Sequence, residues 1–268
     1  MFDLRTSGRW GRGVLAVAVA AMVLAPGAAR AGQPGAAGDG SSDTRAELDG
    51  VTFASTPGTL YVPVREIGER LGWHVGWDAE DETVTLNGEG VPGAHLRSLP
   101  DGTRLIKVRA LRDWDAAVSW DGDAEAARVR RGGEEVTVRK GEKRVAINLE
   151  AQRMRAWQGN RKVLDTRISS GRPRMETPRG SFRAGPLKTR MLISRKYGDA
   201  EMPWSVQVRG DIVIHGFPSV PARAASHGCI RVPLTGSNPA RWFYRWVPTG
   251  APIRIANGWP EKSATASR

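Results

Sequence analysis

The sequence predicts a mainly β protein, in which a small α+β repeat region precedes a longer β-rich domain. Two observations carry this prediction. Between residues 60 and 131, a unit of strand, short helical turn and strand occurs twice, about 44 positions apart. From residue 144 onward, short stretches that alternate apolar and polar residues are separated by turns rich in Gly, Pro and Asn. We expect only one good helix in this second part, at residues 238–246.

Residues 1–31 have the pattern of a secretory signal peptide. Several arginines precede an unbroken apolar run at residues 14–24, and Ala29 and Ala31 supply the small residues of an A-x-A cleavage site. The run is too short to span a bilayer, which needs about 20 residues. An uncleaved signal anchor is the alternative. We therefore expect an exported protein of the periplasm, cell wall or extracellular space, with no stable membrane insertion after cleavage.

The number and distribution of charged residues indicate which binding partners to expect. The formal net charge is +12, which suits an anionic partner such as a wall polymer. The basic residues are scattered among acidic ones and form no basic helix or basic–aromatic motif, so we expect no nucleic-acid partner. Residues 32–45 are rich in Gly, Ala, Ser and Asp and should form a flexible linker.

The repeat region is placed at residues 46–138. We expect its first copy to comprise a strand at 60–65, a helical turn at 66–72 and strands at 75–78 and 82–86. The second copy should comprise the equivalent segments 105–109, 110–114, 118–121 and 127–131. Each copy ends its middle strand in a Trp-Asp pair at a turn.

This pattern resembles the stalk-like N-terminal domain of copper amine oxidases. The resemblance implies a spacer or a wall-binding role. His74 and His95 are the only histidines in the region and form no ligand cluster, so we expect neither copper nor any other metal or cofactor.

The polar stretch 139–143 separates the repeats from a second domain, placed at 143–257 and followed by a tail at 258–268. Strands are expected at 144–149, 152–157, 163–169, 206–208, 211–214 and 253–255, and a turn at 177–182 should open another. Asn238 is a candidate N-cap and Pro239 a first helical residue for the helix.

Cys229 is the one cysteine of the chain, so it has no partner for an intramolecular disulfide. It is a buried inert thiol, half of an intermolecular bond, a metal ligand or a reactive nucleophile. His215 and His227, two of the four histidines, lie within fourteen positions of it. A nearby imidazole can accept the thiol proton, which favours the nucleophile. A zinc site of these three residues would still need a fourth ligand or a water.

The neighbours of Cys229 suit acyl transfer. If the segment is extended, Arg231 and His227 lie two residues away on the same face as the thiol. His215 ends an expected strand and is the preferred base, because a cross-strand partner can face the thiol whereas a neighbour on the same strand lies beside it. Gly228 frees the backbone, so that its amide and that of Cys229 could point at a developing oxyanion.

The run from Ser226 to Arg231, Ser-His-Gly-Cys-Ile-Arg, together with the upstream His215-Gly216, resembles the signature of YkuD-type L,D-transpeptidases. Supporting matches lie at 145–149, 170–171, 177–182 and 248–253. The resemblance implies a β-sandwich-like catalytic domain.

The same resemblance implies residue roles. Cys229 would be the acylated nucleophile and His215 the proton donor and acceptor, oriented by the Gly216 carbonyl. His227 would support the site, and Gly216, Ser226 and Arg231 are the candidate substrate-binding residues. Tyr197 and Trp204 fall in the segment where the family carries a flap over the site.

The implied reaction starts from a peptidoglycan tetrapeptide stem, releases D-Ala, forms a thioester and transfers the acyl group to an amine, typically of diaminopimelate. Carbapenems are expected to acylate the same cysteine. Two alternatives stay open: an L,D-carboxypeptidase with water as acceptor, and a non-catalytic wall-binding protein that kept the fold.

Overall fold

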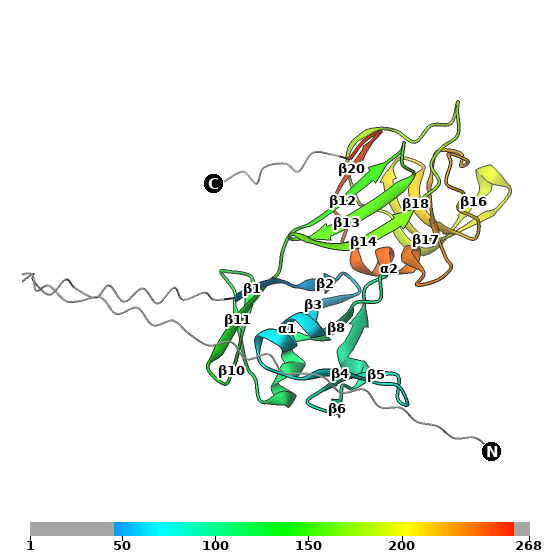
Figure 1. Ribbon diagram of the computed structural model, residues 1–268. Helices are drawn as coiled ribbons and strands as arrows, with labels where there is room; N and C mark the ends of the chain where they lie inside the picture. Colours follow the sequence, from blue (N-terminus) through cyan, green and yellow to red (C-terminus); the bar gives the residue numbers. More distant parts are fainter. Residues whose placement is uncertain (1–45, 260–268) are drawn as a thin grey trace, which may run out of the picture. The chain divides into compact units, whose positions relative to one another are not determined.

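The computed structural model describes residues 46–259 (Figure 1). The expected signal peptide and linker and most of the expected tail lie outside these residues. Within them, no helix is long and apolar enough to cross a membrane. The described residues fall within one compact unit.

The repeat region forms three small antiparallel or mixed sheets. The first has the order β1-β11-β10-β9, the second β2-β3-β8-β7, and the third β4-β5-β6. The strands are β1 (Ala46–Asp49), β2 (Val51–Phe53), β3 (Thr56–Pro63), β4 (Val75–Asp78), β5 (Thr83–Leu86), β6 (Glu89–Gly90), β7 (Leu96–Ser98), β8 (Arg104–Lys107), β9 (Ala117–Asp121), β10 (Ala126–Arg131) and β11 (Glu134–Arg139). The helical pieces are α1 (Val64–Arg70), η1 (Gly93–His95) and η2 (Val108–Trp114).

The two sequence repeats pair with each other through equivalent strands. In β3 and β8, Val62 lies opposite Ile106 in an antiparallel register. Each strand leads directly into a helical segment, but α1 is an α-helix and η2 a 3₁₀-helix. Both segments begin earlier than expected, because Val64 and Val108 at their first positions are buried in a shared apolar cluster.

The second domain contains two sheets that face one apolar core. One sheet has the order β14-β13-β12-β20-β15 and the other β16-β17-β18-β19. The strands are β12 (Lys143–Asn148), β13 (Arg153–Gln158), β14 (Arg161–Arg167), β15 (Gly180–Arg183), β16 (Lys188–Ser194), β17 (Ala200–Arg209), β18 (Ile212–Phe217), β19 (Ile230–Pro233) and β20 (Pro252–Ala256). Ile147 and Ile255 of the first sheet pack with Val206 and Ile230 of the second. The mainly β, sandwich-like prediction is confirmed.

Helix α2 (Pro239–Trp246) is the α-helix of this domain in the described chain, and it begins as expected. The Asn238 side chain accepts a hydrogen bond from the Arg241 backbone N–H, and Pro239 occupies the first helical turn. Phe243 and Trp246 of this helix are fully buried in the core between the sheets.

Several strands were not predicted from the sequence, or only in part. Strands β16, β1 and β11 were not predicted, and only three of the ten residues of β17 were. The strand that was expected to end at His215 continues in β18 through Gly216 to Phe217. Gly216 is therefore not in a turn. It stays in the strand, where a Cβ would collide with the Leu234 side chain.

The apolar core of the second domain extends into the first. Phe53 and Tyr61 belong to the same buried cluster as Trp242 and Trp246 of α2, and the Phe53 and Trp242 rings lie edge to face at 5.7 Å. Lys143 bridges the two parts, since its Nζ donates to the carbonyl oxygens of Thr52 and Trp246, each at 2.7 Å. The two parts are thus packed against each other through apolar and polar contacts.

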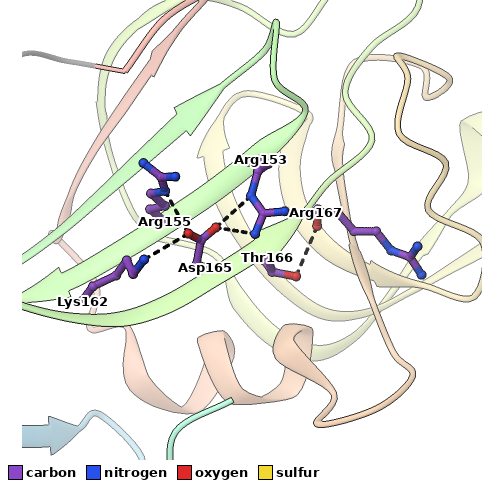
Figure 2. Close-up of polar contacts among 6 residues, drawn as sticks. All are labelled: Arg153, Arg155, Lys162, Asp165, Thr166 and Arg167. Atoms are coloured by element: carbon purple, nitrogen blue, oxygen red, sulfur yellow. Dashed lines mark hydrogen bonds and ion pairs between the residues drawn. The ribbon is translucent and has the colours of Figure 1, made fainter. Parts of the chain in front are cut away.

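The outer face of the β13–β14 pair carries a charge cluster (Figure 2). Asp165 accepts hydrogen bonds from Arg153, Arg155 and Lys162, with N···O distances from 2.6 to 3.2 Å. These side chains alternate with buried ones such as Met154 and Ala156, as expected for strands that cover a core on one face only.

Candidate active site

The site residues come together because β18 and β19 pair in parallel. Ile214 lies opposite Ile230 and His215 opposite Arg231. Ile214 and Ile230 both point into the core. Side chains alternate along strands, so His215 and Arg231 point away from the core on one common face. Cys229 directly precedes β19 and, by the same alternation, starts that face.

The Cys229 thiol is half-buried and makes its contacts with the backbone. Its Sγ lies 3.6 Å from the carbonyl oxygen of Asp211. Burial raises the pKa of Cys229 above its ordinary value; a hydrogen bond from the Val213 backbone N–H and the Arg231 charge act in the opposite direction. The thiol is therefore protonated at rest, and an attack on a carbonyl requires a base.

His215 is buried, with 4% of its surface exposed, and is held by one backbone contact. Its Nδ1 lies 2.9 Å from the Gly216 carbonyl oxygen, which only a protonated Nδ1 can satisfy. Nε2 is then the unprotonated nitrogen and a proton acceptor. Burial lowers the pKa of His215 to about 4; the Gly216 hydrogen bond opposes this shift and the Arg231 charge adds to it. His215 is neutral at neutral pH, the form that a general base needs.

Residues 226–229 form a tight turn rather than an extended strand. Ser226 is buried, and its Oγ donates to the Cys229 carbonyl oxygen and accepts from the Gly228 N–H at 3.1 Å. Gly228 has φ +114°, and a Cβ there would lie 2.8 Å from Ile212 Cδ1. The buried Ser226 hydroxyl thus fixes the turn.

The turn changes which backbone amide could donate a hydrogen bond to an oxyanion. The Gly228 amide donates to Ser226 Oγ, so it is engaged within the turn and does not point freely at a substrate. The Cys229 amide makes no hydrogen bond to another described residue. The backbone donor available beside the thiol is therefore that of Cys229 itself, not that of Gly228.

The His227 ring contacts an aromatic residue far from it in the sequence. It stacks on the Tyr197 ring, with centroids 4.6 Å apart and an interplanar angle of 25°. Tyr197 belongs to η3 (Arg195–Tyr197), between β16 and β17. Burial lowers the pKa of His227, and the charges of Arg172 and Arg231 act in the same direction. His227 therefore anchors the β16–β17 connection above the site.

Arg231 has two kinds of contact. Its backbone forms a bridge with Ser169 through two 3.0 Å hydrogen bonds. Its guanidinium lies 4.1 Å from the centroid of the Phe217 ring. Among the described residues, Arg231 has no ion pair, so its charge is available to a carboxylate of a ligand and to the thiolate.

The comparisons with known protein families match this geometry. Residues 142–255 match the YkuD family model, described as L,D-transpeptidase catalytic domain. The second domain thus matches the catalytic-domain model of the YkuD family over nearly its whole length. Residues 43–92 match a second model, the copper amine oxidase N-terminal domain. Both matches agree in order with the resemblances seen in the sequence.

Solved structures with similarity to the chain include L,D-transpeptidases. One from Stackebrandtia nassauensis is 18% identical, with a TM-score of 0.40, and the match covers 45% of this chain and 58% of that one. One from Mycobacterium smegmatis is 18% identical, with a TM-score of 0.40 and coverages of 80% and 96%. An L,D-transpeptidase in complex with imipenem is 20% identical, with a TM-score of 0.39 and coverages of 81% and 96%. Among curated proteins, none matches the chain.

In the second domain, one polar residue near Cys229 was not assigned a role from the sequence. Thr177 is buried; its Oγ1 donates to the Gly228 carbonyl oxygen at 2.7 Å and accepts from the Gly171 N–H at 2.9 Å. A Cβ at Gly171 would collide with the Met175 carbonyl oxygen, so the chain approaches closely there. Thr177 was visible only as part of a Thr-Pro turn, because its two partners lie far apart in the sequence.

A zinc site of Cys229, His215 and His227 was one alternative left open by the sequence. Within residues 46–259, no group of three or more His, Cys, Asp or Glu side chains is arranged so that it could hold a metal ion. His227 is stacked on Tyr197, and His215 is turned to the Gly216 carbonyl. The three residues of the zinc alternative are therefore not gathered as ligands.

Proposed function

We propose that this protein is a peptidoglycan L,D-transpeptidase that forms a cysteinyl thioester with a tetrapeptide stem and passes the acyl group to an amine. The observation that carries the proposal is the placement of His215 in β18 and of Cys229 at the start of the neighbouring parallel strand β19, with a neutral imidazole and a protonated thiol on one face. This pairing supplies a nucleophile and the base that activates it.

The first half-reaction would acylate Cys229. His215 Nε2 accepts the thiol proton while Sγ attacks the carbonyl that precedes the terminal D-Ala. The Cys229 amide donates to the developing oxyanion. The C–N bond then breaks, and D-Ala leaves with the proton that His215 held. The product is a thioester on Cys229.

The second half-reaction would use the same residues in reverse. An acceptor amine, typically the side chain of diaminopimelate, attacks the thioester while His215 Nε2 accepts its proton. The new amide bond forms as the C–S bond breaks, and the sulfur regains a proton from His215. Arg231 is suited to hold a carboxylate of either stem, since its guanidinium has no described ion pair.

The proposal includes the compartment and the first domain. The apolar run at 14–24 and the A-x-A site at 29–31 support export, as the substrate requires. The repeat region would then act as a spacer or as a wall-binding part.

Mass spectrometry of the intact mature protein tests the proposal. We expect a covalent imipenem adduct on the wild type and none on Cys229→Ala. Incubation with purified disaccharide-tetrapeptide should give crosslinked dimers and free D-Ala. Free tripeptide without dimers would assign a carboxypeptidase. An adduct that persists in Cys229→Ala, or no turnover with any acceptor, would leave the non-catalytic wall-binding protein as the better reading.

A further inference from the structure

A cleft of about 540 Å³ is lined by residues of the first domain, of strands β16 and β17 and of helix α2, and Cys229 is not among them. Phe53, Ser55 and Arg97 contribute to it from the repeat region, and Trp242 and Arg245 from α2. The site described above uses none of these residues. The cleft is therefore built from residues other than those of the candidate active site.

The charge of the cleft has one sign. Four arginines line it and no acidic residue does: Arg97, Arg190, Arg241 and Arg245. Within the described chain, none of the four forms an ion pair. Burial lowers the pKa of Arg245, and repulsion from the other three arginines adds to the shift. Four guanidiniums without ion pairs repel one another in the empty cleft. An anionic ligand would offset this repulsion.

A second cavity of the protein lacks this excess of positive charge. It also measures about 540 Å³ and shares Arg97 with the first, but its lining includes Asp81 and Glu82 beside Arg97 and Arg104. Its formal charges cancel. An excess of arginine across the whole protein would not distinguish the two cavities, so the uncompensated charge belongs to the cleft at α2.

Trp204 adds a strained aromatic wall. It lies in β17 with φ +58°, a conformation that bulky residues rarely adopt. The strand pairs on either side, Thr189 with Ser205 and Met191 with Pro203, leave Arg190 and Trp204 facing each other. The Trp204 ring lies 5.5 Å from that of Tyr244, and both line the cleft. Strain of this kind persists where the surroundings impose it and is concentrated at binding sites.

Hydroxyl groups complete the lining, and one of them is unsatisfied. Thr56 Oγ1 is buried and has no hydrogen-bond partner among the described residues. Ser55 and Ser237 also line the cleft.

The walls are held together before any ligand binds. The Trp242 indole N–H donates to the Ser98 carbonyl oxygen at 2.9 Å, and the Ser55 N–H donates to the Arg245 carbonyl oxygen at 3.0 Å. A cleft with fixed walls loses little entropy on binding.

We propose that this cleft is a second binding site, which takes an anionic glycan of the cell wall. Guanidiniums recognise carboxylate or phosphate groups, while an aromatic wall with nearby hydroxyls suits the apolar faces and hydroxyl edges of a sugar. The site is independent of acyl transfer at Cys229. Its wall residues Arg190 and Trp204 belong to the same hairpin whose tip carries Tyr197 onto His227, so a glycan bound here is held beside the strands that cover the active site.

Binding to the full mature chain carrying Cys229→Ala tests the proposal, because this variant cannot acylate and binding is then independent of the proposed reaction. Two anionic probes distinguish the sources of charge. One is a muramic-acid-containing tetrasaccharide freed of stem peptides, which carries carboxylates. The other is an N-acetylglucosamine-substituted poly(glycerol phosphate). Tryptophan fluorescence and calorimetry report binding. We expect at least one probe to bind, and to bind more tightly than neutral chitotetraose.

Arg190→Gln/Arg245→Gln should weaken that binding roughly 10- to 100-fold, since each guanidinium supplies a charge-assisted hydrogen bond. Both residues are exposed, and the thermal unfolding midpoint checks that the variant is folded. The matched control is Arg70→Gln/Arg109→Gln, which removes the same charge from exposed positions of the repeat region that do not line the cleft.

Four results would overturn the proposal. These are no binding by either probe, equal binding of chitotetraose, equal loss in the Arg70/Arg109 control, and equally tight, arginine-dependent binding of polyglutamate. The last result would assign the cleft to an acidic peptide instead of a glycan. Binding by one anionic probe alone supports the proposal and identifies the charged group.

Discussion

At the scale of single residues, the thiol and imidazole of the active site are both uncharged at rest. Burial acts on them in opposite directions: it raises the pKa of Cys229 and lowers that of His215 to about 4. A preformed thiolate–imidazolium pair is therefore disfavoured before substrate arrives. In the proposed reaction the proton would move to His215 Nε2 during the attack, and His215 would act as a general base in that step.

This arrangement predicts the pH dependence of acylation. The kcat/KM for imipenem should fall as pH drops through about 4, because protonated His215 cannot accept the thiol proton. It should then stay level across neutral pH. Arg231→Gln should move the acidic limb to higher pH, since the Arg231 charge lowers the pKa of His215. Stopped-flow absorbance of imipenem measures the profile, and a limb in wild type near the ordinary imidazole value of 6.5 would contradict the prediction.

Thr177 should matter as a positioning residue. Thr177→Val keeps the shape but removes the bonds to Gly171 N–H and the Gly228 carbonyl oxygen, which leaves buried backbone groups unpaired. We expect the acylation rate to fall roughly 10-fold or more through loss of the turn's geometry. Thr177→Ser should restore most of the rate because it restores the hydroxyl. Equal rates for Val and Ser variants would refute this role.

The sequence was most informative where chemistry is concentrated in one short motif. Cys229, His227 and Arg231 lie in one run, and His215-Gly216 stands only a short distance upstream, so their proximity could be predicted. Tyr197 above His227 and Thr177 below Gly228 depend on tertiary contacts across some 30 and 50 positions. An extended segment from 227 to 231 was the basis for placing His227 on the face of the thiol, whereas Gly228 lies in a turn at φ +114°.

At the scale of elements, predictions succeeded where apolar residues alternate or lie in one continuous segment. Strands β12 and β18 were predicted from apolar segments and contain four consecutive buried residues each. Helix α2 begins at its Asn238 cap, and β13 follows the rule of alternation. Strand β16 does not: its residues are all exposed or half-buried, because it lies at the edge of its sheet. An edge strand covered on neither face lacks the period that sequence analysis detects.

The β13–β14 pair yields a stability prediction (Figure 2). Burial acts to raise the pKa of Asp165, but hydrogen bonds from Arg153, Lys162 and Arg155 outweigh it and lower the pKa. Asp165→Asn should lower the free energy of unfolding by about 1 kcal/mol at pH 7, a modest value because the cluster is partly exposed.

The stabilisation by Asp165 should decrease as the pH falls. A lowered carboxyl pKa stabilises the fold above the ordinary value of 3.8, and this stability is lost as pH falls below it. The difference between wild type and Asp165→Asn should therefore shrink toward pH 3 in urea titrations. Asp123→Asn, which removes an exposed carboxylate outside the cluster, is the control and should change the unfolding free energy little. A difference that grows toward low pH would contradict the assignment.

At the scale of the whole molecule, the two sequence-defined regions share a core. The sequence indicated a polar boundary at 139–143 but could not show what lies across it. Lys143, in that boundary, is half-buried and donates to carbonyls of both regions, and its Nζ lies 4.9 Å from the centroid of the Trp246 ring. Polar residues at a boundary thus mark a change of fold unit without implying independent motion.

This shared core predicts cooperative unfolding. Phe53 of the first region packs against Trp242 of α2, and both belong to the cluster that fills the second domain. Phe53→Ala should cost about 3–5 kcal/mol, as expected for a buried aromatic residue. Because contacts of both regions depend on that cluster, tryptophan fluorescence and far-UV circular dichroism should lose signal in one transition with a common midpoint, shifted in the variant. Leu187→Ala, at a position 40% exposed, is the matched control and should shift the midpoint little. Two separate transitions, of which only the first-region one responds to Phe53→Ala, would show that the two regions unfold independently despite their contact.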